Sequence, residues 1–184
     1  MKVTPTELPG VLLLSPQVFG DSRGHFFEPY NTRRFAAAGI QDNFVQDNVS
    51  SSQRGVLRGL HLQHPHGQAK LVQVLIGAIY DVVIDVRRGS PHFGRWYAVT
   101  LRADEHQLLY VPAGFAHGFC VTSDAALFAY KVTDFYSPAD EITVLWNDPD
   151  LGIPWPAEAP TLSPKDMAGR RLRDVPEARL PAFA

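Results

Sequence analysis

Short runs of strand-forming residues, each closed by a turn signal, recur along most of this 184-residue chain. The runs are rich in Val, Ile, Leu and aromatic residues, which favour β-strands. Turn residues such as Gly77, Gly89-Ser90-Pro91 and Ser137-Pro138 separate the runs at close intervals. Regular short strands with polar turns are typical of an antiparallel sandwich or barrel. The predicted strands are 11–14, 71–76, 79–86, 96–101, 107–111, 126–135 and 142–146.

Helical signals are confined to two short segments. Asn31 or Thr32 can cap a helix over 33–38, and Gly39 supplies its stop. From residue 147 the chain is rich in Pro and charge, which predicts loops and a short helix near 164–171. At this length, with no internal repeat or linker, we expect one domain over 1–184, with the tail 147–184 packed on the β-structure.

Composition excludes several classes of function. A net charge of −2 provides no field for nucleic acid or an anionic membrane, so we expect neither as a partner. Cys120 is the only cysteine, which precludes an intrachain disulfide and fits a reducing compartment. No apolar run approaches the roughly 20 residues of a spanning helix. The first residues lack the apolar core of a signal peptide, so we expect a cytoplasmic protein.

The run from His64 to Lys70 has the spacing of a metal-binding motif, but its last position holds a lysine in place of a ligand. In metal-binding cupins, His-x-His is followed after three residues by a carboxylate; here that position holds Lys70. Residues 112–117, ending in His117, have the spacing that would supply the last ligand. An ammonium cannot ligate a cation and repels one. The sequence therefore predicts a pocket of this kind without a metal, and His64 and His66 as loop residues around Pro65.

The strand predicted over 79–86 carries two acids on one face. Asp81 and Asp85 alternate with an apolar row formed by Tyr80, Val82, Ile84 and Val86. Two interpretations remain open. The acids form a solvated outer face, as surface acids usually do, or Asp81 lines the interior and orients a histidine.

Several chemically able groups lie near the metal-site lookalike. His61, whose residue type titrates near neutral pH, is a candidate general base. Arg54, Arg58 and Lys70 lie within seventeen residues around it and can neutralise phosphates or a developing oxyanion. As isolated patterns these signals are weak.

An ordered set of motifs gives the chain a specific resemblance. It resembles the dTDP-4-dehydrorhamnose 3,5-epimerase family from about residue 11 to residue 166. The matching motifs are Phe19-Gly20-Asp21-Ser22-Arg23-Gly24, Gln46-Asp47-Asn48, Gly55-Val56-Leu57-Arg58-Gly59-Leu60-His61-Leu62-Gln63, Lys70-Leu71-Val72, Asp81-Val82-Val83-Ile84-Asp85-Val86-Arg87, Pro112-Ala113-Gly114-Phe115-Ala116-His117-Gly118-Phe119 and Leu162-Ser163-Pro164-Lys165-Asp166.

The resemblance implies a fold, a reaction and a partner. The fold is a mainly β, cupin-like jelly roll with short peripheral helices. The reaction inverts carbons 3 and 5 of a dTDP-4-keto-6-deoxyhexose through enolates, with no metal or other cofactor. Members are usually homodimers to which an N-terminal segment, here about residues 1–50, contributes. Several groups from residues 19–48 then complete a site in the same or the partner subunit.

The resemblance also implies roles for individual residues. His61 is the base, oriented by Asp166; Tyr130 is the acid that reprotonates the opposite face; Lys70 stabilises the enolate oxygen. His117 contacts the sugar with Asp81 behind it, and Tyr136 stacks on the thymine. Further substrate contacts are implied for Arg23, Glu28, Gln46, Asp47, Asn48, Arg58, Glu141 and Lys165. Without the resemblance, core packing explains Tyr130 and Tyr136 as well.

Four alternatives to the double epimerase stay open at this stage. They are an epimerase that inverts a single carbon, a 3,4-ketoisomerase of the same substrate class, a metal-dependent cupin, and a sugar-binding cupin without catalysis. Lys70 argues against the metal cupin. The joint presence of His61, Tyr130, Lys70 and Asp166 argues against a simple binder, which has no need of an acid–base pair.

Overall fold

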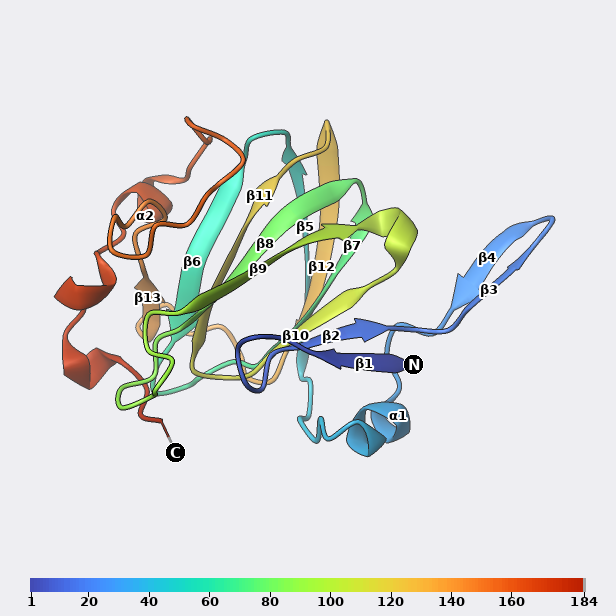
Figure 1. Cartoon of the computed structure of the whole chain (residues 1–184), viewed down its shortest axis with the longest axis horizontal. Helices are drawn as coiled ribbons and strands as arrows, with labels where there is room; N and C mark the ends of the chain where they lie inside the picture. Colours follow the sequence, from blue (N-terminus) through green and yellow to red (C-terminus); the bar gives the residue numbers. More distant parts are fainter. Residues whose placement is uncertain (184) are drawn as a thin grey trace.

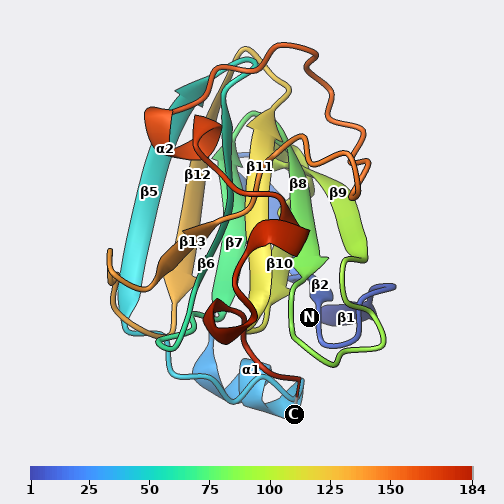
Figure 2. The same ribbon diagram turned by 90° about the vertical axis from the view of Figure 1, so that its left-hand side faces the viewer.

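The computed structural model describes residues 1–183 and shows two antiparallel sheets packed face to face (Figures 1 and 2). Ala184, the last residue of the predicted tail, lies outside the described residues. The larger sheet has the order β1 (Lys2–Pro5), β2 (Leu12–Ser15), β10 (Leu108–Val111), β7 (Lys70–Ile76), β12 (Ala125–Val132), β5 (Gln46–Gln53). The smaller has the order β13 (Glu141–Thr143), β6 (Leu57–Gln63), β11 (Phe115–Val121), β8 (Ala78–Asp85), β9 (Trp96–Arg102).

The remaining elements lie at the periphery. The hairpin of β3 (Val18–Asp21) and β4 (Gly24–Phe27) extends away from both sheets (Figure 1). Helix α1 (Thr32–Ala37) begins as predicted, because the Oδ1 of Asn31 accepts the backbone N–H groups of Arg33 and Arg34. Helix α2 (Pro164–Met167) is shorter than predicted, and three 3₁₀ turns cover Ala103–Glu105, Leu172–Asp174 and Glu177–Arg179.

Three apolar clusters hold these layers together. The central cluster lies between the sheets and joins Val72 and Leu109 of the larger sheet to Val83 and Phe115 of the smaller one. A second covers the outer face of the smaller sheet, where Leu172, Val175 and Leu180 of the tail pack against β6 and β8. A third places Phe35 of α1 over the outer face of the larger sheet. Both faces of each sheet are therefore partly covered.

Strand β8 is buried on both faces, which decides between the two interpretations of its acids. Val82 and Ile84 face the tail, whereas Ile79 and Val83 face the central cluster. Asp81 and Asp85 share the inner parity and are both 0% exposed. The solvated outer face was therefore the wrong interpretation.

The strand predictions were correct for seven elements and incomplete for the rest. Every predicted run contains an observed strand, although 126–135 ends early at Val132 and 142–146 shortens to Glu141–Thr143. Strands β1, β3, β4, β5, β6 and β11 were missed.

No helix in residues 1–183 is long and apolar enough to cross a lipid bilayer.

Candidate active site

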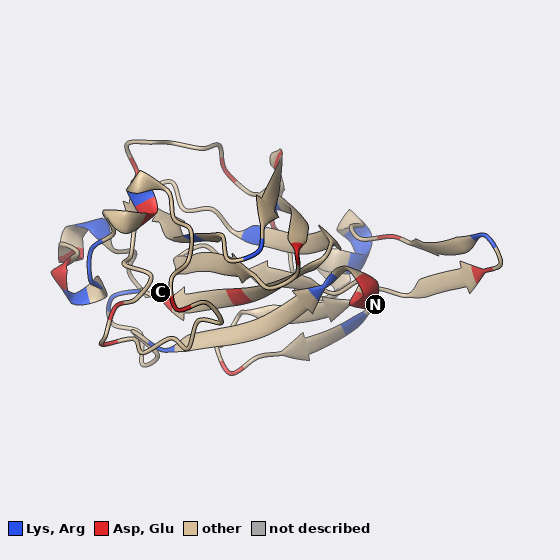
Figure 3. Ribbon diagram, turned by 90° about the horizontal axis from the view of Figure 1, so that it is seen from above, with Lys and Arg blue, Asp and Glu red and all other residues tan. Residues whose placement is uncertain are grey.

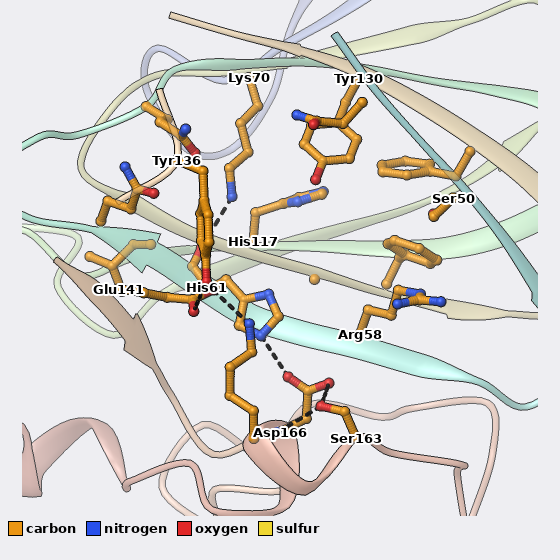
Figure 4. A pocket seen from close by; sticks show the side chains of 18 of the residues that line it. Ser50, Arg58, His61, Lys70, His117, Tyr130, Tyr136, Glu141, Ser163 and Asp166 are labelled. Atoms are coloured by element: carbon orange, nitrogen blue, oxygen red, sulfur yellow. Dashed lines mark hydrogen bonds and ion pairs between the residues drawn. The ribbon is translucent and has the colours of Figure 1, made fainter. Parts of the chain in front are cut away.

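A cavity of about 810 Å³ opens between the two sheets and is bordered on one side by the segment that carries α2. The larger sheet contributes side chains of β5, β7 and β12, and the smaller sheet those of β6, β11 and β13. This volume lies within the range of small-molecule sites. Figure 4 shows the polar side chains of both sheets converging on it.

His61 and Asp166, 105 residues apart in sequence, meet at the edge of this cavity. The Nε2 of His61 lies 2.5 Å from the Oδ1 of Asp166. Ser163 donates its hydroxyl to the other carboxylate oxygen at 2.7 Å, and accepts the N–H of Asp166 at 3.1 Å (Figure 4). Because a carboxylate accepts, Nε2 carries the proton and Nδ1 keeps a free lone pair. This is the arrangement of an oriented general base.

The surroundings tune both groups of this pair. Burial lowers the pKa of His61, although the hydrogen bond and charge of Asp166 act in the opposite direction. Burial alone would raise the pKa of Asp166, but the hydrogen bonds from His61 and Ser163 outweigh it, and the pKa lies below its usual value. The imidazole is therefore neutral and the carboxylate charged at neutral pH.

Tyr130 faces the cavity from the opposite wall. It lies on β12 of the larger sheet, whereas His61 lies on β6 of the smaller one. Figure 4 shows its hydroxyl pointing into the cavity. Burial raises the pKa of Tyr130, so the phenol keeps its proton at neutral pH and can donate it. The cavity thus has a neutral imidazole on one side and a protonated phenol on the other.

Lys70 supplies a cation beside His61. It begins β7, and its Nζ donates to the backbone oxygen of His61 at 3.3 Å. Burial lowers the pKa of Lys70 to about 8, while the charges of Asp81 and Glu141 act to raise it. The side chain is still mostly an ammonium at pH 7, where it can stabilise a developing oxyanion.

His117 and Asp81 form a second buried pair at the inner end of the cavity. The Nε2 of His117 lies 2.9 and 3.0 Å from the two carboxylate oxygens. The side chain of His117 is 6% exposed and that of Asp81 is 0% exposed. The predicted placement of Asp81 behind a histidine therefore matches the observed geometry.

Two glycines allow β6 and β11 to approach closely at this point. Gly59 has φ +124°, and a Cβ there would lie 2.5 Å from the Cα of Gly118. A Cβ on Gly118 would lie 2.7 Å from the backbone oxygen of Arg58. No side chain fits at either position. The close approach brings Arg58, His61 and His117 onto one wall.

A polar network forms the outer part of the cavity. The hydroxyl of Tyr136 donates to Glu141 at 2.9 Å, and Lys165 donates to the other oxygen of that carboxylate at 2.7 Å. On the facing wall Gln46 donates to Asn48 at 2.8 Å. Arg58 lies on β6 and donates to Ser52 at 3.1 Å. These six predicted contact residues all line the cavity.

Three predicted contact residues lie elsewhere in the chain. Arg23 is at the tip of the β3–β4 hairpin, where it pairs with Asp21 at 2.6 Å; Figure 3 shows both signs of charge at this tip. Glu28 follows the hairpin and pairs with Arg34 at 3.3 Å. Asp47 points to the other face of β5 and pairs with Lys131 at 2.8 Å.

The residues of the metal-site lookalike do not assemble. His64 and His66 lie in the loop between β6 and β7, and His66 bonds to Asp140 at 2.6 Å. In residues 1–183 no cluster of three or more His, Cys, Asp or Glu side chains is placed to hold a metal ion.

Ser163 is a site residue to which the sequence analysis assigned no role. The sequence Ser-Pro-Lys-Asp could have indicated it, because it is typical of a helix N-terminus, with Ser as the N-cap and Pro in the first turn.

Comparison with known proteins places this site in a family. The family model described as dTDP-4-dehydrorhamnose 3,5-epimerase matches residues 5–174. The chain belongs to the dTDP-4-dehydrorhamnose 3,5-epimerase family. The predicted resemblance, the cupin-like fold and the assignment as an epimerase are thereby confirmed.

Three members of this epimerase family illustrate the similarity. The dTDP-4-dehydrorhamnose 3,5-epimerase of Pseudomonas aeruginosa is 52% identical over 177 residues, covering 95% of this chain and 98% of that one. A dTDP-6-deoxy-D-glucose-3,5-epimerase of Legionella pneumophila, crystallised with dTDP-4-keto-L-rhamnose, is 44% identical with a TM-score of 0.97, covering 100% of this chain and 98% of that one. A dTDP-4-dehydrorhamnose 3-epimerase of Streptomyces niveus is 40% identical, covering 100% of this chain and 90% of that one.

The depressed pKa of Lys70 predicts a titration close to pH 8. Nitrogen-detected NMR of labelled Lys70 should give a midpoint of about 8. Asp81→Asn should lower the midpoint further, because the carboxylate that favours the ammonium is removed. Since the unfolded chain holds this proton more tightly, the contribution of Lys70 to the free energy of unfolding rises between pH 8 and 10.5. A midpoint above 10 in the folded protein would contradict the described burial.

Proposed function

We propose that the chain epimerises dTDP-4-dehydro-6-deoxy-D-glucose at carbons 3 and 5 to give dTDP-4-dehydro-L-rhamnose. One observation carries the proposal: the His61–Asp166 pair and Tyr130 face one cavity from opposite walls. Epimerisation removes a proton from one face of a carbon and returns one to the other face. Such a reaction needs a base and an acid on opposite sides.

The mechanism follows from the chemistry of a ketone. Carbons 3 and 5 flank the carbonyl at carbon 4, so loss of a proton from either gives an enolate. His61 takes this proton at Nδ1, and Asp166 stabilises the imidazolium through Nε2–H. Lys70 donates to the enolate oxygen. Tyr130 then protonates the carbon from the other side. Exchange of both side chains with solvent restores neutral His61 and protonated Tyr130.

The outer network suits the nucleotide part of this substrate. Arg58 and Lys165 supply positive charge for the diphosphate. The exposed ring of Tyr136 offers a face on which thymine can stack, and Gln46 and Asn48 offer amide groups. His117, oriented by Asp81, is placed for a sugar hydroxyl. We expect no metal or other cofactor, because this chemistry requires only acid, base and cation.

Inversion at both carbons has more support than inversion at one. The relative from Pseudomonas aeruginosa, a 3,5-epimerase by name, is 52% identical, whereas the 3-epimerase from Streptomyces niveus is 40% identical. A single free, buried Cys120 and a nucleotide-sugar substrate fit a cytoplasmic enzyme.

We further propose that two copies pair and share residues between their sites. The β3–β4 hairpin extends away from the sheets and exposes Phe19 and Phe26 by 55% and 70% (Figure 1). Such exposed aromatic groups favour burial against another surface. In a pair of copies, the hairpin of one subunit can carry Arg23 and the adjoining Glu28 to the cavity of the other.

Isotope exchange tests the enolate mechanism. In deuterated water with dTDP-4-dehydro-6-deoxy-D-glucose, the wild-type protein should introduce deuterium at carbons 3 and 5. His61→Asn should slow this exchange about 1,000-fold, because general-base catalysis contributes roughly 10²–10⁴-fold. His66→Asn, a histidine outside the cavity, is the matched control and should exchange at the wild-type rate. Label at one carbon supports the single-carbon alternative, and exchange by His61→Asn at the wild-type rate would remove the base assignment.

Subunit complementation tests the shared site. Arg23→Ala and His61→Asn should each be poorly active alone. After an equal mixture is unfolded and refolded, its activity should rise to at most about a quarter of the wild-type value, since half of the pairs are hybrids and one of the two sites in each hybrid has both side chains intact. A mixture no more active than its components, or a fully active monomer in sedimentation equilibrium, would refute shared sites.

A further inference from the structure

Gln63 is a buried amide at the end of β6, two residues beyond His61. Its side chain makes three hydrogen bonds to backbone groups although the residue is only 5% exposed. Nε2 donates to the carbonyl oxygens of His66 at 2.9 Å and Phe135 at 3.3 Å, and Oε1 accepts from the N–H of Ser137 at 3.0 Å. Carbonyls only accept and a backbone N–H only donates, so these partners fix the orientation of the amide.

Two of these bonds bracket Tyr136. Phe135 and Ser137 are its immediate neighbours, and both are held by the same side chain. In the described chain, residues 133–140 have no strand partner between β12 and β13. Phe135 and Tyr136 are 65% and 53% exposed, so apolar burial does little to place them. The position of the Tyr136 ring therefore depends on polar contacts.

Most of those contacts come from β6, the strand that carries the proposed base, and from its neighbour β13; the N–H of Tyr136 itself donates to Gln46 of β5 at 3.4 Å. Gln63 and His61 share one face of β6, because side chains alternate along a strand. Gln63 is also in register with Glu141, the partner of the Tyr136 hydroxyl. A rigid strand thus connects the base to the backbone on both sides of Tyr136.

We propose that Gln63 is a positioning residue that holds Tyr136 at the edge of the cavity and so sets the affinity for a nucleobase stacked there. The proposal rests on the proposed function for the identity of that ligand. It assigns Gln63 to binding: the residue acts through Tyr136 and leaves the proton chemistry of His61 unchanged.

Amide hydrogen exchange of the protein without ligand tests whether Gln63 restrains the segment 134–140. Gln63→Met keeps the length of the side chain and removes all three bonds. Backbone amides of 134–140 should then exchange at least about tenfold faster, because loss of these bonds makes local opening easier. Gln107→Met, a half-buried glutamine outside the cavity lining, is the matched control and should leave this segment unchanged.

Binding of dTDP tests the route through Tyr136. Gln63→Met should weaken dTDP binding about tenfold and raise KM by a similar factor. It should keep kcat within about threefold of the wild-type value, and the apparent pKa of the low-pH limb of kcat/KM should not change. In a Tyr136→Ala background, Gln63→Met should reduce the affinity for dTDP by less than about twofold, because Gln63 acts through Tyr136. Gln63→Leu, which also removes all three bonds without burying a charge, should weaken dTDP binding by a similar factor and serves if Gln63→Met folds poorly.

Three results would overturn the proposal. The first is exchange of the 134–140 amides at the wild-type rate in Gln63→Met. The second is a tenfold loss of dTDP affinity on Gln63→Met that persists in the Tyr136→Ala background. The third is a shift of the low-pH limb of kcat/KM in Gln63→Met. A wild-type protein that does not bind dTDP overturns the proposed function and the nucleobase assignment with it. Hydrogen exchange would still decide, independently, whether Gln63 holds the segment.

Discussion

An apolar sandwich that encloses a polar cavity must provide a hydrogen-bonding or charged partner for each polar side chain that it buries. His117 has Asp81, His61 has Asp166, and Lys70 lies near Asp81 and Glu141. Removing one member of such a pair leaves an unpaired buried group, which is strongly destabilising. The partners come from separate elements, so the pairs bring β6, β8, β11 and the tail together. The groups that would do the chemistry also fix the architecture.

The tail contributes to the site as well as to the core. Leu172, Val175 and Leu180 anchor it on the smaller sheet, and a backbone bridge joins Val144 to Arg170. These contacts lie just beyond Asp166 and hold it against β6. Ser163 caps the short helix that carries Asp166 and bonds to its carboxylate. Placement of the carboxylate therefore depends on packing of the tail.

Apolar patterning found the strands with apolar runs, including β7 and β12 of the site, but missed the polar or glycine-interrupted strands β5, β6 and β11. The runs at β7, β8 and β9 are apolar and were found, whereas β5, with the sequence Gln46-Asp47-Asn48-Val49-Ser50-Ser51-Ser52-Gln53, has almost no apolar signal. Polar residues face the cavity on one side of that strand and solvent on the other. Strands β6 and β11 are interrupted by Gly59 and Gly118, which the close approach requires. Local propensity did not reveal these strands. Residue type and spacing had drawn attention to His61, Arg58 and His117, but Gln46 and Asn48 of β5 were identified only through the resemblance to known epimerases.

The central claim is that a base and an acid act from opposite walls, and Tyr130→Phe tests it most directly. This variant keeps the ring and removes only the acidic proton. In deuterated water it should still introduce label into recovered, uninverted substrate, because His61 can remove a proton and return a deuteron to the same face. Inverted product should form at least about 100-fold more slowly than with the wild-type protein. Inversion by Tyr130→Phe at the wild-type rate would contradict the account.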